Sequence, residues 1–283
     1  MATWCATSLP DPDVPDAAPA TITAWHYRQF DADFNLDVPA EGYGGWRKGA
    51  IPWDLHRTAL VSMHAWDTGT RTEYSGWHRA VEYIPRADRI VETSLGPLLD
   101  AFRAADAPRI HVTGGGDYPK RCAGYRSSAE ATQFEPLPPD SHVDALHAFR
   151  REHVFTGLHN EADVRRGFAR IDFPDRVRPL GEEPVVEDAP SLDAWCRERG
   201  VRHLIYAGFA LNWCLLMSPG GMIDMVRRGY VCSAVRDATT SVENRESARS
   251  ESHHEEALWR TALAFGFVFD SADLIVAVGR SGR

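Results

Sequence analysis

Short, nearly continuous apolar runs alternate along the chain with polar segments of helical periodicity. Four runs of strand length cover residues 58–63, 109–113, 204–207 and 231–235. Such runs are typical of strands that are buried on both faces of a parallel sheet. Strands that alternate with helices favour right-handed crossovers, which place helices on both faces of the sheet. The pattern therefore predicts an α/β fold of three layers, α/β/α, with a central, mostly parallel, Rossmann-like sheet of about six strands.

Several other segments have the apolar spacing of helices or strands. Residues 85–106 have helical spacing, and Pro97 within them is expected to bend or interrupt the helix. Residues 191–199 predict a further helix, which a glycine ends. Residues 267–269 and 274–276 are expected to close the chain as a last strand or pair of strands.

Composition and periodicity divide the chain into three parts. Residues 1–20 are rich in proline and are expected to be disordered or extended. Residues 21–56 form an aromatic-rich arm, which we expect to begin with a strand and continue as an irregular segment. This arm would cover an apolar surface of its own chain or of a neighbouring subunit, or act as a lid over the functional site. Residues 57–283 form the main domain, with an excursion outside the sheet over residues 117–184.

The overall composition excludes several classes of protein. The chain has 283 residues, 43% of them hydrophobic, and a formal net charge of −9. Acidity argues against a nucleic-acid surface and against binding to anionic membranes. The sequence shows neither a run of transmembrane length nor the pattern of a signal peptide. Five cysteines without paired spacing favour a reducing, cytoplasmic compartment.

The stretch that ends at Cys214 is the strongest candidate for chemistry. An apolar run stops at Gly208, and helical periodicity starts near Trp213. A strand that turns sharply into a helix places its turn at the carboxyl end of a parallel sheet, where open α/β sheets bind ligands. Cys214 would then lie at a helix N-terminus, which favours a nucleophilic thiolate, beside amides that can bind an oxyanion. The alternative is that Cys214 is a small, buried core residue.

This stretch resembles the signature of the isochorismatase-like cysteine hydrolases. In that family a strand ends in a Gly-x-Ala-Thr-Asn/Asp-x-Cys-Val turn, and here the corresponding residues, 206–216, read YAGFALNWCLL. Residues 227–231 and 235–241 are similar to the helix end, strand and loop that follow, and residues 58–63 resemble the first strand. The resemblance covers about residues 57–278. It implies an isochorismatase-type fold, cleavage of a small C–N bond by the cysteine, and a homo-oligomer.

The resemblance also implies roles for residues near the turn. It places Cys214 at the nucleophile position and Ala210–Leu211 at a cis peptide bond whose neighbouring amides bind the oxyanion in the family. A family acid at the end of the first strand acts as general base, and His64 stands there in this chain, with Asp67 three residues later. The lysine that supports the acid in the family has no counterpart before the third strand.

Three interpretations of the general base follow. In the first, His64 accepts the thiol proton, and Lys120 or Arg121 supplies positive charge from the end of the second strand. In the second, Asp67 is the base and His64 is structural, although a turn or helix-capping role is the simpler one for Asp67. In the third, the triad is lost and the protein only binds a ligand or partner.

The remaining polar residues near the turn give weaker signals. Trp66 and Asn212 are candidates for contact with the substrate because they flank the proposed base and nucleophile. Asp237 and Glu243 follow the strand at residues 231–235, and helix capping is the simpler explanation for each. The triple glycine after the second strand lacks the spacing of a nucleotide-binding loop, so no cofactor is expected. No metal site is expected either, because the histidine pairs lack ligand spacing.

The leading hypothesis is therefore a hydrolase that cleaves a small amide, carbamoyl or related C–N bond through a covalent intermediate on Cys214. The alternative is an inactive binding or scaffold protein of the same fold. A third hypothesis, hydrolysis of a vinyl ether, needs no cysteine but depends on the family acid, which His64 replaces. The expected partners are a small-molecule substrate and further copies of the chain, with neither nucleic acid nor membrane.

Overall fold

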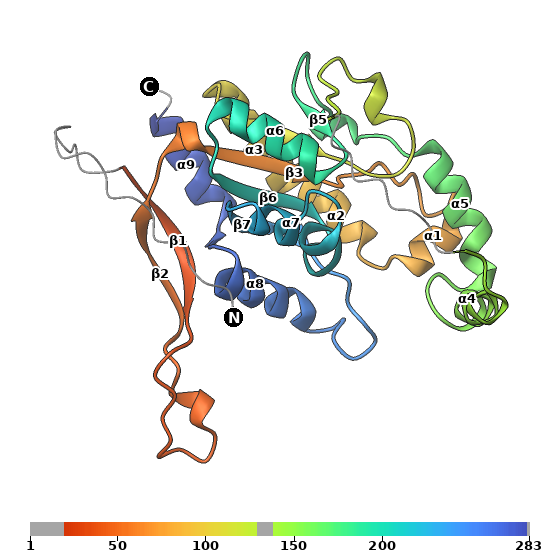
Figure 1. Ribbon diagram of the computed structural model, residues 1–283, viewed down its shortest axis with the longest axis horizontal. Helices are drawn as coiled ribbons and strands as arrows, with labels where there is room; N and C mark the ends of the chain where they lie inside the picture. The colour runs from red at the N-terminus through yellow and green to blue at the C-terminus, as the bar shows by residue number, and fades with distance from the viewer. Residues whose placement is uncertain (1–19, 129–137, 282–283) are drawn as a thin grey trace.

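The chain is built around one eight-stranded sheet in the computed structural model, which describes residues 20–128 and 138–281 (Figure 1). The spatial order of the strands is β2-β1-β8-β7-β6-β3-β4-β5. Pairing is parallel from β8 to β5, whereas β1 pairs antiparallel with both β2 and β8. The strands are β1 Thr21–Arg28, β2 Gly45–Pro52, β3 Thr58–Met63, β4 Arg109–Val112, β5 Val185–Val186, β6 His203–Phe209, β7 Val231–Thr240 and β8 Val268–Phe269.

Helices cover both faces of this sheet. One hydrophobic core packs α6, α7 and α8 against one face, and a second core packs α3 and α9 against the other. The three-layer α/β/α fold is thus confirmed. The α-helices are α1 Ser75–Ala80, α2 Ile84–Ile90, α3 Gly96–Ala104, α4 Ser141–His153, α5 Glu161–Arg170, α6 Ala189–Arg199, α7 Met222–Arg227, α8 Ser252–Ala264 and α9 Ser271–Ser281.

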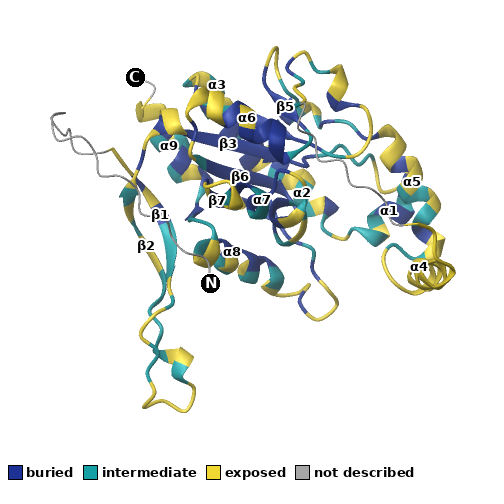
Figure 2. Ribbon diagram, in the orientation of Figure 1, coloured by how far each residue is buried: buried dark blue, intermediate teal, exposed yellow. Residues whose placement is uncertain are grey.

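The central strands are buried because helices cover both their faces. All six residues of β3 are buried, and β6 is buried from Leu204 to Phe209. Figure 2 shows the same contrast, with a buried sheet centre and exposed surfaces on α4, α5 and the β1–β2 hairpin. The continuous apolar runs in the sequence correspond to this double coverage.

Gly208 allows β6 to pass close to β3 where both strands end. Its φ of +129° is one that residues with side chains rarely adopt, and a Cβ built on it would lie 1.9 Å from the carbonyl oxygen of Met63. Only glycine fits this close approach. The carboxyl ends of β3 and β6 are therefore in direct contact, so the residues that follow them, His64 and Ala210, lie at one edge of the sheet.

Two sequence-based expectations about the chain ends need correction. The arm at residues 21–56 is irregular only between its two strands and at its end, because β1 and β2 pair along eight residues each and extend the main sheet. Residues 274–276 are not a strand but lie within α9, where Leu274 and Val278 pack one helical turn apart against the sheet. Of the predicted lead segment at residues 1–20, residues 1–19 lie outside the described residues.

The helical segment at residues 85–106 is interrupted as predicted. It consists of α2, a π-helical turn at Val91–Leu95, and α3, whose second residue is Pro97. Helices α4 and α5 lie outside the sheet, as expected for the excursion (Figure 1). Within residues 20–128 and 138–281, none of the helices is long and apolar enough to cross a membrane.

Candidate active site

Cys214 lies in a short turn directly after β6. The turn is a single π-helical segment, Leu211–Leu215, in which the amides of Trp213 and Leu215 both donate to the carbonyl of Ala210 at 3.2 and 3.1 Å. The expected long helix does not begin here, because the chain breaks again at Gly220 and Gly221 before α7. The thiol therefore sits on one helical turn rather than at the N-terminus of a long helix.

Cys214 lines a partly open, mostly apolar cavity of about 340 Å³. A volume of this size is in the range of small-molecule sites. The lining comes from the ends of β3 and β6, from α1, α2 and α5, and from the loops after α4 and β7. The lining residues are His64, Trp66, Thr68, Trp77, Ala80, Val81, Tyr83, Ile84, Ala87, Asp88, Phe155, Val164, Phe168, Phe209, Trp213, Cys214 and Val242.

His64 shares this cavity with Cys214, as the sequence predicted. It follows β3 in a left-handed conformation, with φ of +53°, and its ring stacks on Trp66 at 4.8 Å. Only 7% of the residue is exposed, and Nδ1 has no hydrogen-bond partner among the described residues. Burial lowers the pKa of the imidazole to about 4, so the ring is neutral at physiological pH. A neutral imidazole can accept a proton.

Asp67 does not line the cavity. Its carboxylate accepts a hydrogen bond from the amide of Gly69 at 2.9 Å and forms an ion pair with Arg170 at 2.8 Å. This is the turn role that the sequence favoured for Asp67. The interpretation in which Asp67 is the general base therefore finds no support in the geometry.

Lys120 and Arg121 also lie away from the cavity lining. Lys120 pairs with Asp117 at 2.7 Å, and Arg121 pairs with Asp172 at 3.2 Å. Both basic side chains are more than half exposed. The expectation that they supply positive charge near Cys214 is therefore wrong. Both residues belong to a short 3-10 turn at Pro119–Arg121, and their side chains lie at the surface.

Asn212 stabilises the turn through the backbone of Val242. Its Nδ2 donates to the Val242 carbonyl, and its Oδ1 accepts from the Val242 N–H, both at 2.9 Å. The amide is thus engaged with the protein, which leaves the expected substrate contact without support. Trp66, the other candidate for substrate contact, does line the cavity, and its indole N–H donates to the hydroxyl of Tyr118 at 3.0 Å.

The cis peptide bond lies one position before the expected one. It joins Phe209, the last residue of β6, to Ala210. Leu211, which stands where the family has threonine, is fully buried in the core under the turn.

Sequence reasoning missed most of the cavity lining, including two residues that titrate, Tyr83 and Asp88. Burial raises the pKa of the Tyr83 phenol, and a thiolate at Cys214 would raise it further, so Tyr83 stays protonated and can donate a hydrogen bond. Partial burial raises the pKa of Asp88, the one carboxylate among the described residues of the lining. Tyr83 lies just before the helical segment that was predicted from Pro85 onwards, and Asp88 lies within that segment. Its spacing shows a helix but does not show which face meets the cavity.

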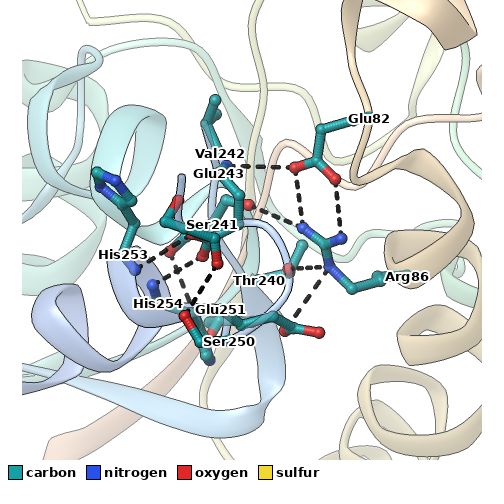
Figure 3. Close-up of polar contacts among 12 residues, drawn as sticks. Glu82, Arg86, Thr240, Ser241, Val242, Glu243, Ser250, Glu251, His253 and His254 are labelled. Atoms are coloured by element: carbon teal, nitrogen blue, oxygen red, sulfur yellow. Dashed lines mark hydrogen bonds and ion pairs between the residues drawn. The ribbon is translucent and has the colours of Figure 1, made fainter. Parts of the chain in front are cut away.

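A polar network fixes the loop after β7 against α2 (Figure 3). Glu82 accepts two hydrogen bonds from Arg86 at 2.8 and 2.9 Å, and Arg86 also donates to the hydroxyl of Thr240 at 3.1 Å. The amide of Glu243 donates to Glu82 at 3.2 Å. Because Tyr83 follows Glu82 and Val242 precedes Glu243, these contacts hold two walls of the cavity in place.

Asp237 and Glu243 cap helices, as the sequence favoured. Glu243 is buried and accepts from the amides of His253 and His254 at the start of α8, at 3.2 and 2.9 Å (Figure 3). Asp237 accepts from the amide of Ser271 at the start of α9, at 2.8 Å. Carboxylates in these positions satisfy amides that lack partners within the helix. Among the residues that the structure describes, no group of three acids, histidines or cysteines is placed to hold a metal ion.

Comparison with known proteins gives a consistent result. A family model described as the isochorismatase domain matches residues 71–273. A cysteine hydrolase from Pseudomonas syringae pv. phaseolicola 1448A is similar over 82% of this chain and 97% of its own, with 17% identity and a TM-score of 0.54. An isochorismatase family protein from Burkholderia thailandensis is similar over 79% of this chain and 96% of its own, with 16% identity and a TM-score of 0.45. N-carbamoylsarcosine amidase from Thermoplasma acidophilum is similar over 76% of this chain and 96% of its own, with 16% identity and a TM-score of 0.41. None of the curated proteins gives a significant match.

Proposed function

The chain belongs to the isochorismatase family, and from this we propose that it is a cysteine-dependent hydrolase of a small amide, carbamoyl or related C–N bond. The observation that carries the proposal is that Cys214 and His64 line one cavity at the carboxyl ends of β6 and β3. A nucleophile and a proton acceptor in one apolar cavity are the two groups that acyl transfer requires.

The proposed reaction has two halves. In the first, His64 accepts the thiol proton, the sulfur of Cys214 bonds to the carbonyl carbon, and the C–N bond breaks as the imidazolium protonates the leaving nitrogen. In the second, His64 takes a proton from water, the resulting hydroxide attacks the thioester carbon, and the C–S bond breaks as the imidazolium returns its proton to the sulfur, which restores the thiol and the neutral imidazole. The net reaction consumes one water and yields an acid and an amine.

The proposed charge balance follows from the burial of His64. An imidazolium is costly in an apolar cavity, which is why the pKa of His64 is low. The thiolate formed in the same step offsets this cost by supplying a negative charge in the same cavity. Donors for the oxyanion would come from backbone amides of the turn at Cys214 other than that of Trp213, which already donates to the Ala210 carbonyl, and from the protonated hydroxyl of Tyr83.

The test compares Cys214→Ala and Cys214→Ser with a matched control, Cys122→Ala, since Cys122 is a free cysteine outside the cavity lining. Release of amine or ammonia from a panel of amides and carbamoyl compounds is measured, with mass spectrometry for an acyl adduct on the protein. We expect turnover and adduct in the wild type and the control and neither in the Cys214→Ala variant. Undiminished turnover by Cys214→Ala would rule out the mechanism.

A second candidate function is ligand binding without catalysis. It is favoured by the histidine at the family's acid position and by the lining, which contains no lysine. The rate of alkylation by iodoacetamide across pH separates the two. A thiol that reacts fast well below pH 8.5, about the pKa of a free cysteine, supports the hydrolase. Slow alkylation despite an accessible cavity supports the binding protein.

A further inference from the structure

Aromatic rings make up much of the wall of the cavity at Cys214. Trp77 stacks on Phe168 with ring centroids 5.0 Å apart, and Trp66 meets Phe168 edge-on at 5.6 Å. A second pair, Phe155 and Trp213, has centroids 6.3 Å apart. All five side chains line the cavity. Such walls favour a flat, apolar ligand or one with a positive charge, because an aromatic face carries partial negative charge.

The ring of Trp77 is held tightly by the helix behind it. A Cβ built on Gly167 of α5 would lie 2.0 Å from this ring, so the indole occupies space that any other residue at position 167 would fill. Trp77 is only 2% exposed. The aromatic wall is therefore preformed, which reduces the entropy lost when a ligand binds.

The charge of the lining has one sign. Asp88 is the one acidic side chain in it, and neither lysine nor arginine is among the lining residues of the described chain. His64 adds no charge at physiological pH because its ring is neutral. A ligand carboxylate would thus lose hydration without gaining a cation, and it would lie in the same cavity as Asp88. A ligand ammonium would gain both the carboxylate and the aromatic faces.

Two buried polar atoms of the lining have no hydrogen-bond partner among the described residues. They are Nδ1 of His64 and the hydroxyl oxygen of Thr68. Buried polar groups in folded proteins nearly always have a partner, so a ligand or water is expected at these two atoms. The ligand should therefore carry a polar group, such as an amide, in addition to its apolar body.

We infer that the cavity takes a single-ring aromatic amide that bears a protonated amine and no negative charge, with the amine directed to Asp88. The identity of the cleaved bond rests on the proposed function, whereas the recognition of ring and charge rests on the cavity alone. A volume of about 340 Å³ accommodates one ring with short substituents.

The test uses three benzamides of matched size that differ in their para substituent: aminomethyl, hydroxymethyl and carboxyl. Their dissociation constants are measured by calorimetry on Cys214→Ser, which separates binding from turnover, and kcat/KM is measured on the wild type. We expect the cationic amide to bind about tenfold more tightly than the neutral one, from ion pairing and cation–π contact, and the anionic amide to bind more weakly still. Asp88→Asn should clearly reduce the affinity ratio of the cationic to the neutral amide, because the ion pair is lost and only the cation–π contact remains. Asp106→Asn, at a fully exposed carboxylate outside the lining, should leave that ratio unchanged.

The outcomes separate recognition from catalysis. Binding in the expected order without turnover by the wild type supports the inference on recognition and counts against hydrolysis of these amides. Tighter binding of the anionic amide, a ratio insensitive to Asp88→Asn, or failure of all three amides to bind would overturn the inference, even if another amide is hydrolysed.

Discussion

Asn212 and Val242 exchange two hydrogen bonds, each of 2.9 Å, between the turn that carries Cys214 and the loop after β7. Val242 lines the cavity, and the next residue, Glu243, caps α8. A single amide side chain thus links the thiol, one cavity wall and the N-terminus of a helix. The relationship explains why an asparagine is suited to this position, since one amide side chain supplies both the donor and the acceptor.

Loss of this link should destabilise the protein and alter the reactivity of the thiol. Asn212→Ala leaves two backbone groups of Val242 without partners, which we expect to lower the free energy of unfolding by about 1–3 kcal/mol. Asn212→Asp keeps the acceptor and should cost less. Urea unfolding measures the first effect, and iodoacetamide alkylation of Cys214 measures the second. Wild-type values for both properties in Asn212→Ala would show that the link has no structural importance.

His64 should make the protein less stable as the pH falls. Its pKa is about 4 in the folded protein and 6.5 when unperturbed, so the unfolded state binds more protons between these values. Stability is therefore full above pH 6.5 and decreases as the pH falls toward 4, by about 3 kcal/mol in total from this group. The slope of the unfolding free energy against pH reports how many more protons the unfolded state binds. His64→Gln should lower that number by about one in this range.

His203→Gln is the matched control for the pH experiment. Burial lowers the pKa of His203 to about 4 as well. Its Nε2 forms a hydrogen bond of 2.8 Å with the hydroxyl of Ser233, and the residue does not line the cavity at Cys214. His203→Gln should therefore reduce the pH dependence of the unfolding free energy by a similar amount and leave alkylation of Cys214 unchanged. His64→Gln should change both. Equal effects of the two variants on alkylation would indicate that His64 has only a structural role.

Gly208 should tolerate no side chain. Gly208→Ala places a methyl group against the backbone of Met63 and imposes a φ of +129° on alanine, so we expect a loss of more than about 4 kcal/mol, or failure to fold. Gly279→Ala is the control, since a Cβ there meets no atom within 4 Å and the site is in α9. It should stabilise the protein by about 0.5–1 kcal/mol. Expression and thermal unfolding check both, and a stable Gly208→Ala protein would contradict the described strand contact.

The homo-oligomer expected from the sequence remains a prediction, and the β1–β2 hairpin suggests where it forms. The hairpin extends away from the sheet (Figure 1), and none of its residues lines the cavity, which argues against a lid over the site. Its tip exposes Phe30, Phe34, Leu36 and Val38, with Phe34 85% exposed. We expect sedimentation to give a multiple of the single-chain mass for the wild type and a lower mass for Phe34→Asp. Leu263→Asp, at an exposed residue of α8, is the control. A monomeric wild type would refute the prediction.

The sequence placed the turn that carries Cys214 near His64 because local features mark both. Each strand is marked by its own continuous apolar run, one just before Gly208 and one that ends at Met63. Because neighbouring parallel strands end at a common edge of the sheet, the residues after the two runs come close together. Lys120 and Arg121 follow such a strand too, yet a 3-10 turn directs them outward. Proximity to a strand end therefore did not settle which way a side chain points.

The sequence by itself determined the layered fold, the main strands and the position of Cys214, because strand and helix periodicities depend on near neighbours in the chain. Only the tertiary structure decided what surrounds the thiol. Asp88 reaches the cavity from α2, Tyr83 from the residue before that helix, and Phe168 from α5. All three lie more than 40 residues from Cys214 along the chain. Their approach depends on how whole helices dock against the sheet. That docking is set by the summed packing of many side chains rather than by any local pattern.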